Sequence, residues 1–300
     1  VAKRIDLRAA NKRTFEGMVF AGGFDSFKET QRSQYFAQDE KGLTFLEKAI
    51  KYGSKFQENE NSSQVSLFGE ASDIQLPEPI IPIAEKWGVM EKLSREKEVV
   101  GIYISGHPLD DFKNELNYFC NAQLTDFQDP KELLNKEVSI AGIVSSVEHR
   151  ISKNGKGWAS FFIEDYSGSH EFRLFGEDYL KFKHFLVPNS FLYLKIAARK
   201  NHYNDDIRLQ FNNVQLLHDV LEQMSKKITI QLDINKLDEN KLESISSIIE
   251  AHKGKKSLHF TVYDMKDEVK VNLPSRSKKI NISNEFLSIL DKESLKYKLN

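Results

Sequence analysis

Five segments between residues 138 and 217 look like β-strands, and they constrain the fold more than any other feature. Each is rich in β-branched and aromatic residues, and they are VSIAGIVSSVEH (138–149), WASFFIED (158–165), HEFRLFG (170–176), FLYLKIAARK (191–200) and IRLQFNNVQLL (207–217). A helical stretch, EDYLKFKHFLV, follows the third segment. Five strands with a helix after the third are the order of an OB-fold β-barrel, which we expect over residues 131–222. Gly142 suits a bulge or tight bend in the first strand.

Barrels of this kind bind nucleic acid on the face of strands two and three and through the loops beside them. Alternation places Ala159, Phe161 and Ile163 on one face of strand two, and Trp158, Ser160 and Phe162 on the other. Phe172 and Leu174 of strand three then face the core, opposite Glu171, Arg173 and Phe175. The candidate nucleic-acid-binding residues are Arg150, Lys153, Lys156, Trp158, Phe162, Arg173, Arg199, Lys200 and Tyr203.

A structural reading of the same residues stays open. Phe162 and Phe175 can instead pack under the intervening helix, and loop lysines can be solvated without binding anything. Residues 136–217 hold 11 basic and 9 acidic side chains, so any binding is expected to be weak and sensitive to salt.

The flanking regions make the chain a multidomain α+β protein. Apolar residues at helical spacing predict a helical segment over residues 1–50, which includes a helix over 5–20, and a second helical segment over 84–130. The strand KITIQLDI, the helix ENKLESISSIIEAHK and the strands SLHFTVYD and EVKVNLP predict a small C-terminal α+β domain over 223–300.

Residues 51–83 are expected to be a linker. From Gln57 to Ile83 there is no lysine or arginine, and prolines stand at 77, 79 and 82. Within this stretch, QVSLF places Leu67 and Phe68 among polar residues. Such a pair either docks into a partner's apolar pocket or packs back onto the helical region, and spacing alone favours neither.

The sequence points to no active site. Glycine loops that hold phosphate, GxSxG, HExxH and CxxC are all absent. Adjacent residues of a strand face opposite ways, so Glu164 and Asp165 are expected to form a turn and not a metal site. The single cysteine, Cys120, excludes an internal disulfide framework and fits a reducing cytoplasm. No membrane span is expected, and the chain, which starts at Val1, reads as a piece of something longer.

Three stretches resemble one family, the bacterial DNA polymerase III alpha subunit of the DnaE type, in its C-terminal part. They are EKLSREKEVVGIYISGHPLDDF (91–112), LRAANKRTFEGMVFAGGFDSF (7–27) and QVSLFG (64–69), although Gly23 stands where the family usually has alanine. The resemblance implies that Gln64, Val65, Ser66, Leu67 and Phe68 grip the sliding clamp (the beta subunit). It also implies that the barrel handles single-stranded template and that the C-terminal domain contacts the clamp-loader tau subunit.

The same resemblance implies that the carboxylates for nucleotidyl transfer, and the magnesium ions they hold, belong to segments upstream of Val1. We therefore expect no catalytic residue, metal or cofactor in this chain, although the resemblance implies that the longer protein is a DNA-directed DNA polymerase of the cytoplasm. Two alternatives are a free-standing OB-fold protein that binds single-stranded nucleic acid or tRNA, and a small metal-dependent nuclease.

Overall fold

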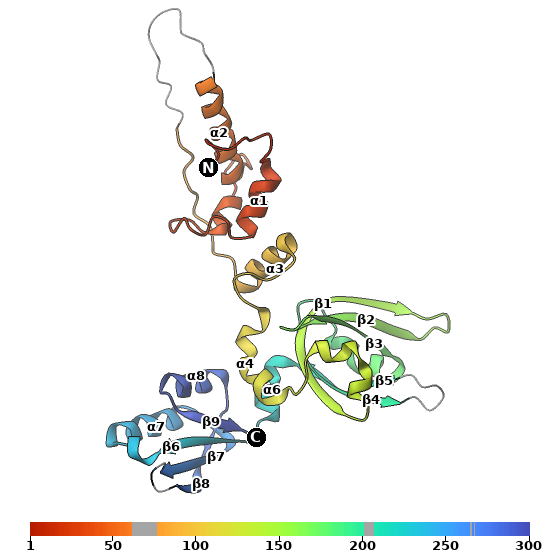
Figure 1. Ribbon diagram of the computed structural model, residues 1–300, viewed down its shortest axis with the longest axis vertical. Coiled ribbons are helices and arrows are strands. Elements are labelled where there is room, and N and C mark those ends of the chain that lie inside the picture. The colour runs from red at the N-terminus through yellow and green to blue at the C-terminus, as the bar shows by residue number, and fades with distance from the viewer. Residues whose placement is uncertain (62–76, 201–206, 265, 267) are drawn as a thin grey trace, which may run out of the picture. The chain divides into compact units, whose positions relative to one another are not determined.

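The computed structural model describes residues 1–61, 77–200, 207–264, 266 and 268–300 (Figure 1). The chain divides into two compact units, Val1–Pro108 and Leu109–Asn300. The first unit is helical, and the second carries two separate β-sheets. The predicted clamp-binding residues 64–68 and Tyr203 lie outside the described residues.

The first unit is built from α1 (Lys12–Phe20), the short helix η1 (Arg32–Phe36), α2 (Phe45–Asn61) and α3 (Val89–Val100). Its core holds Phe15, Val19, Phe24, Tyr35 and Leu46. The helix expected over residues 5–20 begins later, at Lys12, because the Asn11 side chain accepts a hydrogen bond from the Thr14 N–H and caps it.

Both ends of the linker expected over residues 51–83 contact the helical unit, and its middle, residues 62–76, lies outside the described residues. Helix α2 continues to Asn61, so residues 51–61 are helical. After the undescribed stretch, Glu78 accepts hydrogen bonds from Lys3 and from Tyr52 of α2, each 3.2 Å long. The Pro82 carbonyl accepts a 2.8 Å bond from Gln34. The chain therefore leaves and rejoins the same helical unit on the two sides of residues 62–76.

A buried ion pair ties the elements of this unit together. Arg32 Nη1 donates to Glu96 Oε1 over 2.8 Å, and Arg32 also bonds Asp25. The other oxygen of Glu96 accepts the backbone N–H groups of Ile104 and Ser105, each at 2.8 Å. Glu96 is fully buried and Arg32 is 9% exposed. One carboxylate thus connects α3, η1 and the segment that follows α3.

The second unit contains the predicted barrel. Its strands are β1 (Glu137–Ile151), β2 (Gly157–Glu164), β3 (Ser169–Phe175), β4 (Phe191–Lys200) and β5 (Ile207–Leu216), and α5 (Gly176–Phe182) with η5 (Lys183–Phe185) follows β3. All five predicted strands and the helix are confirmed. The sheet order is β3-β2-β1-β4-β5, antiparallel throughout.

Strand β1 pairs with both β2 and β4, so it must bend around the barrel. A register shift lies between Val144 and Ser146, as expected for a bulge in a small barrel. At Gly142, a Cβ atom would lie 2.3 Å from Ile163 Cγ2 and 2.5 Å from the Glu164 carbonyl oxygen. Glycine is therefore required there for the two strands to approach.

The turn between β2 and β3 is organised by Asp165. Its Oδ1 accepts bonds from the Ser167 N–H (2.7 Å), the Ser167 hydroxyl (2.6 Å) and the Gly168 N–H (3.1 Å). Its Oδ2 accepts from the Leu124 N–H at 2.9 Å. The expectation that this carboxylate forms a turn is confirmed.

Beyond the barrel, α6 (Leu217–Met224) leads into a second sheet of order β8-β7-β6-β9. Its strands are β6 (Lys227–Asp233), β7 (Lys253–Asp264), β8 (Val269–Ile280) and β9 (Lys296–Leu299), with α7 (Glu239–Ala251) and α8 (Asn284–Lys292). The short helix η2 (Pro108–Phe112) and α4 (Lys113–Phe119) precede the barrel. Glu115 of α4, fully buried, accepts a 2.8 Å bond from Asn284 at the start of α8.

Candidate nucleic-acid interface

The outer face of strands β1, β2 and β3 carries the predicted platform. Cross-strand pairing sets Arg150 of β1 opposite Trp158 of β2, and Trp158 opposite Phe175 of β3. The Trp158 and Phe175 rings stack with centroids 5.4 Å apart and planes 21° apart. The Arg150 guanidinium lies 5.6 Å from the Trp158 ring centroid, a cation–π distance. The three side chains form one continuous row.

Alternation separates this face from the core as predicted. Ala159, Phe161 and Ile163 are fully buried, and Phe172 and Leu174 are each 1% exposed. On the outer face Phe162 is 41% exposed and Phe175 is 53% exposed. The alternative in which these two rings pack beneath the helix is therefore wrong, and both are open to a stacking partner.

The two arginines of this face are held by carboxylates of their own strands. Arg150 pairs with Glu148. Arg173 donates two bonds to Glu171, from Nε over 3.0 Å and from Nη2 over 3.1 Å. Hydrogen bonds from Arg173 and then from Ser160 lower the pKa of Glu171. A phosphate must therefore compete with a carboxylate for each arginine, although exposed pairs of this kind are weak.

The loop between β1 and β2 presents two exposed lysines, Lys153 and Lys156. The loop is tight, since Gly155 adopts a φ of 73° and the Ser152 N–H donates to the Lys156 carbonyl over 2.8 Å. Neither lysine makes an ion pair with another described residue. Both ammonium groups are thus available to a phosphate.

At the far end of the hairpin β4–β5, Arg199 and Lys200 are exposed, and Arg199 lies opposite Arg208 of β5. Arg208, Arg173 and Phe175 line one groove of about 460 Å³ between β3 and β5. Arg199 and Lys200 are not among the residues that line it. The structure therefore brings Arg173 and Phe175 together with Arg208, which the sequence analysis did not single out.

Arg208 could have been found from the hairpin register, because it is the residue facing Arg199 across the β4–β5 pair.

Among the residues that the structure describes, no group of three His, Cys, Asp or Glu side chains is placed to hold a metal ion. Within the same residues, no helix is long and apolar enough to cross a membrane.

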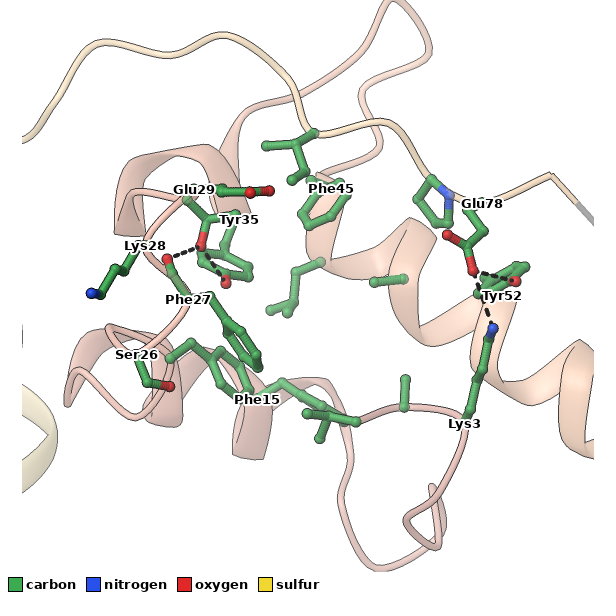
Figure 2. A pocket seen from close by; sticks show the side chains of 18 residues that line it. Lys3, Phe15, Ser26, Phe27, Lys28, Glu29, Tyr35, Phe45, Tyr52 and Glu78 are labelled. Carbon is green, nitrogen blue, oxygen red and sulfur yellow. Dashed lines mark hydrogen bonds and ion pairs between the residues drawn. The ribbon is translucent and has the colours of Figure 1, made fainter.

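A second hollow lies in the helical unit and is mostly apolar (Figure 2). Its volume is about 770 Å³, and Phe15, Phe27, Tyr35 and Phe45 contribute to its wall. At one end, Lys3 and Tyr52 both bond Glu78 (Figure 2). The segment after residue 76 thus contributes Glu78, Pro79 and Ile81 to the wall of the hollow.

The barrel defines the class of protein: residues 138–217 match the model of the OB-fold nucleic acid binding domain. Residues 228–300 match that of the DNA polymerase III alpha subunit, C-terminal domain. The chain is therefore related to the C-terminal part of bacterial DNA polymerase III alpha subunits.

Three relatives illustrate this. All are DNA polymerase III alpha subunits. That of Mycobacterium tuberculosis is 26% identical over 262 residues, covering 85% of this chain and 21% of the relative. That of Borreliella burgdorferi is 25% identical over 284 residues, covering 91% of this chain and 23% of the relative. That of Campylobacter jejuni is 33% identical over 175 residues, covering 57% of this chain and 14% of the relative. The chain thus spans between 14% and 23% of the length of these relatives.

Among solved structures, a mitochondrial single-stranded DNA-binding protein of Saccharomyces cerevisiae aligns with 27% of this chain and 93% of its own, at 18% identity and a TM-score of 0.20.

Proposed function

We propose that this chain serves as an accessory, C-terminal part of a replicative DNA polymerase subunit, and that its barrel binds single-stranded template DNA. The observation that carries the proposal is the row of Arg150, Trp158 and Phe175 on the face formed by β1, β2 and β3, in which Arg150 and Phe175 are exposed and Trp158 is half-buried. Stacked aromatic rings beside a cation are the surface on which the bases of single strands stack.

Single strands fit this face better than duplex does, since stacking needs bases whose faces are not already paired with neighbours in a helix. The loop lysines Lys153 and Lys156 supply phosphate contacts beside the platform. Because Glu148 and Glu171 neutralise two arginines of the same face, the affinity is expected to be modest. A modest affinity suits a protein that must move along its template.

The test is a binding titration with a fluorescent oligo-dT strand and with a duplex competitor. The strand should bind more tightly than the duplex. Lys153→Glu with Lys156→Glu should weaken binding. It should also make the negative slope of log K against log salt shallower, by roughly 0.7 for each lost contact. The control carries the same charge change at two exposed lysines of the helical unit, Lys28→Glu with Lys86→Glu. A double variant that keeps the wild-type slope would exclude this loop from the binding surface.

We further propose that Gln64, Val65, Ser66, Leu67 and Phe68 tether the chain to the sliding clamp. Support comes from the resemblance of QVSLFG to the clamp-binding motif of the family and from an apolar pair in a polar, proline-flanked stretch. Leu67 and Phe68 would enter an apolar pocket with the Gln64 amide at its rim. Two buried anchors of this size contribute roughly 1.5–3 kcal/mol each before ordering costs.

Leu67→Ala with Phe68→Ala should therefore remove most clamp affinity and leave folding unchanged, because anchors dominate such interfaces. A clamp titration and a thermal melt of the same protein measure the two effects. Ser62→Ala with Ser63→Ala, in the same stretch, is the matched control. Unchanged clamp binding together with a lower melting temperature would instead assign the pair to core packing.

The remaining roles follow from the family and are part of the same proposal. The C-terminal domain would contact the clamp-loader tau subunit, and nucleotidyl transfer with its magnesium ions would belong to other segments of a longer polymerase. This chain would then add no nucleotide to a primed template by itself.

A further inference from the structure

The C-terminal sheet has one face covered by helices and one that is polar. Ile228, Ile230 and Leu232 of β6 pack in one core with residues of α7 and α8. That core includes Ile245 and Ile249 of α7, and Phe286, Leu287 and Leu290 of α8. Because side chains alternate along a strand, the intervening residues of β6 and of its neighbours point to the opposite face.

The register places the polar side chains of that opposite face in rows across the strands. Thr229 of β6 lies between His259 of β7 and Lys298 of β9. Gln231 lies between Thr261 and Lys296, and Thr261 pairs in turn with Asn272 of β8. We call this surface the lysine face; its residues are Lys227, Thr229, Gln231, Asp233, Ser257, His259, Tyr263, Lys270, Asn272, Lys279, Lys296 and Lys298. Thr261 stands in the same rows but is only 4% exposed.

The charge on the lysine face is one-sided. Lys227, Lys270, Lys279, Lys296 and Lys298 make no ion pair with any residue that the structure describes. The one carboxylate of the face, Asp233, already accepts a 3.1 Å hydrogen bond from the Asn235 N–H, and it lies 3.7 Å from the Lys236 ammonium. Two arginines of the barrel, Arg150 and Arg173, in contrast each pair with a glutamate. The lysine face is therefore an uncompensated positive surface.

A hollow of about 680 Å³ continues this surface beside β9. Gln231, Lys296 and Lys298 line it together with Tyr118 of α4, whose side chain is 38% exposed. Asp291 is the carboxylate in its wall. An aromatic ring thus stands next to two cations at the edge of the sheet, as it does on the barrel.

We propose that the lysine face binds the phosphodiester backbone of single-stranded nucleic acid, as a second contact separate from the barrel. Phosphate contacts in proteins come from lysines together with Ser, Thr, Asn and Gln side chains, the set found here. Residues of one face recur about every 6.6 Å along a strand and 4.8 Å between strands, so the five lysines form an array and not a point site.

An acidic peptide fits this face less well. Peptide and protein partners need buried apolar anchors, and the strand residues of the lysine face are polar or charged. The exposed apolar residues of β8, namely Val269, Val271 and Leu273, point the other way, since Val271 and Leu273 pair with Val262 and Phe260 beside the helix-covered core.

The test compares two charge reversals in the full chain, read by titration of a fluorescent oligo-dT strand over a salt series. Lys296→Glu with Lys298→Glu alters the lysine face, and Lys241→Glu with Lys292→Glu makes the same charge change on helices α7 and α8. The first variant should bind about tenfold more weakly at low salt. Its negative slope of log K against log salt should become shallower by roughly 1.4, at about 0.7 for each lost phosphate contact. The second should match the wild type.

A second variant at the opposite edge of the lysine face, Lys270→Glu with Lys279→Glu on β8, should reproduce the loss, and thermal melts should show all three proteins folded. Wild-type slopes in both face variants would overturn the proposal. An equal loss in the helix variant would also overturn it, because bulk charge would then explain the binding. The result does not depend on the barrel. If the Lys153 and Lys156 variant has no effect on binding, the variants of the lysine face still test whether that face binds the strand.

Discussion

Replacing Glu96 by alanine is expected to lower the free energy of unfolding of the helical unit by about 3–5 kcal/mol, the range for removing one partner of a buried ion pair. The loss has two sources. Arg32, 9% exposed, loses the carboxylate 2.8 Å away and keeps only its pair with Asp25, and the N–H groups of Ile104 and Ser105 lose their acceptor. Alanine is itself a good helix former, so α3 should not be weakened by propensity.

Urea unfolding followed by circular dichroism measures this change. The matched control is Glu98→Ala, two residues further along α3, because Glu98 is 68% exposed and lies 3.7 Å from Arg95. It should change stability by no more than about 0.5 kcal/mol. Equal effects from the two substitutions would show that the pair of Arg32 and Glu96 does not hold the unit together.

The same pair makes stability depend on pH in one direction. Burial acts to raise the pKa of Glu96, but the hydrogen bonds from Ser105, Ile104 and Arg32 outweigh it, and the net pKa is lowered. A carboxyl whose folded pKa lies below its unfolded value stabilises the fold above the unfolded pKa. That contribution is lost as the pH falls through the folded pKa, so the wild type should lose its advantage over the alanine variant in acid.

The second large effect is expected on the barrel. Trp158→Ala with Phe175→Ala should weaken binding of single-stranded DNA at least tenfold, since each base stacked on an aromatic ring contributes about 1–3 kcal/mol. Both rings are on the outer face, so the barrel core formed by Phe161, Phe172 and their neighbours stays intact. Fluorescence anisotropy with an oligo-dT strand gives the affinities.

Two controls accompany that experiment. Phe27→Ala removes a ring that is 49% exposed in the helical unit and should leave DNA binding unchanged. Trp158→Phe keeps an aromatic face and should retain most of the affinity. If alanine at both positions binds the strand as tightly as the wild type, the stacked row is not the platform.

The barrel could be predicted from sequence because its signals are local. Alternating apolar residues in WASFFIED and HEFRLFG assign Phe161 and Phe172 to the core without knowledge of any partner. Spacing by two residues likewise places Glu148 with Arg150, and Glu171 with Arg173, on one face, so their pairing could have been foreseen.

Contacts between distant segments could not be predicted in this way. Arg32 and Glu96 are separated by 64 residues, and no local pattern marks either as buried. The groove that joins Arg208 to Arg173 and Phe175 depends on how β3 and β5 approach in the barrel. The true end of α2 at Asn61 was also missed, because the polar residues after Phe56 resemble a linker in sequence although they continue the helix.

The central claim is that single-stranded DNA stacks on the outer face of the barrel at Trp158. The chain has two tryptophans, and Trp87 belongs to the helical unit, where its ring stacks on Phe20 and Phe36. In a Trp87→Phe variant, emission reports on Trp158 alone. Titration with an oligo-dT strand should quench that emission with the same midpoint as the anisotropy of the strand. Emission that stays constant while anisotropy shows saturation would place the DNA elsewhere and contradict the claim.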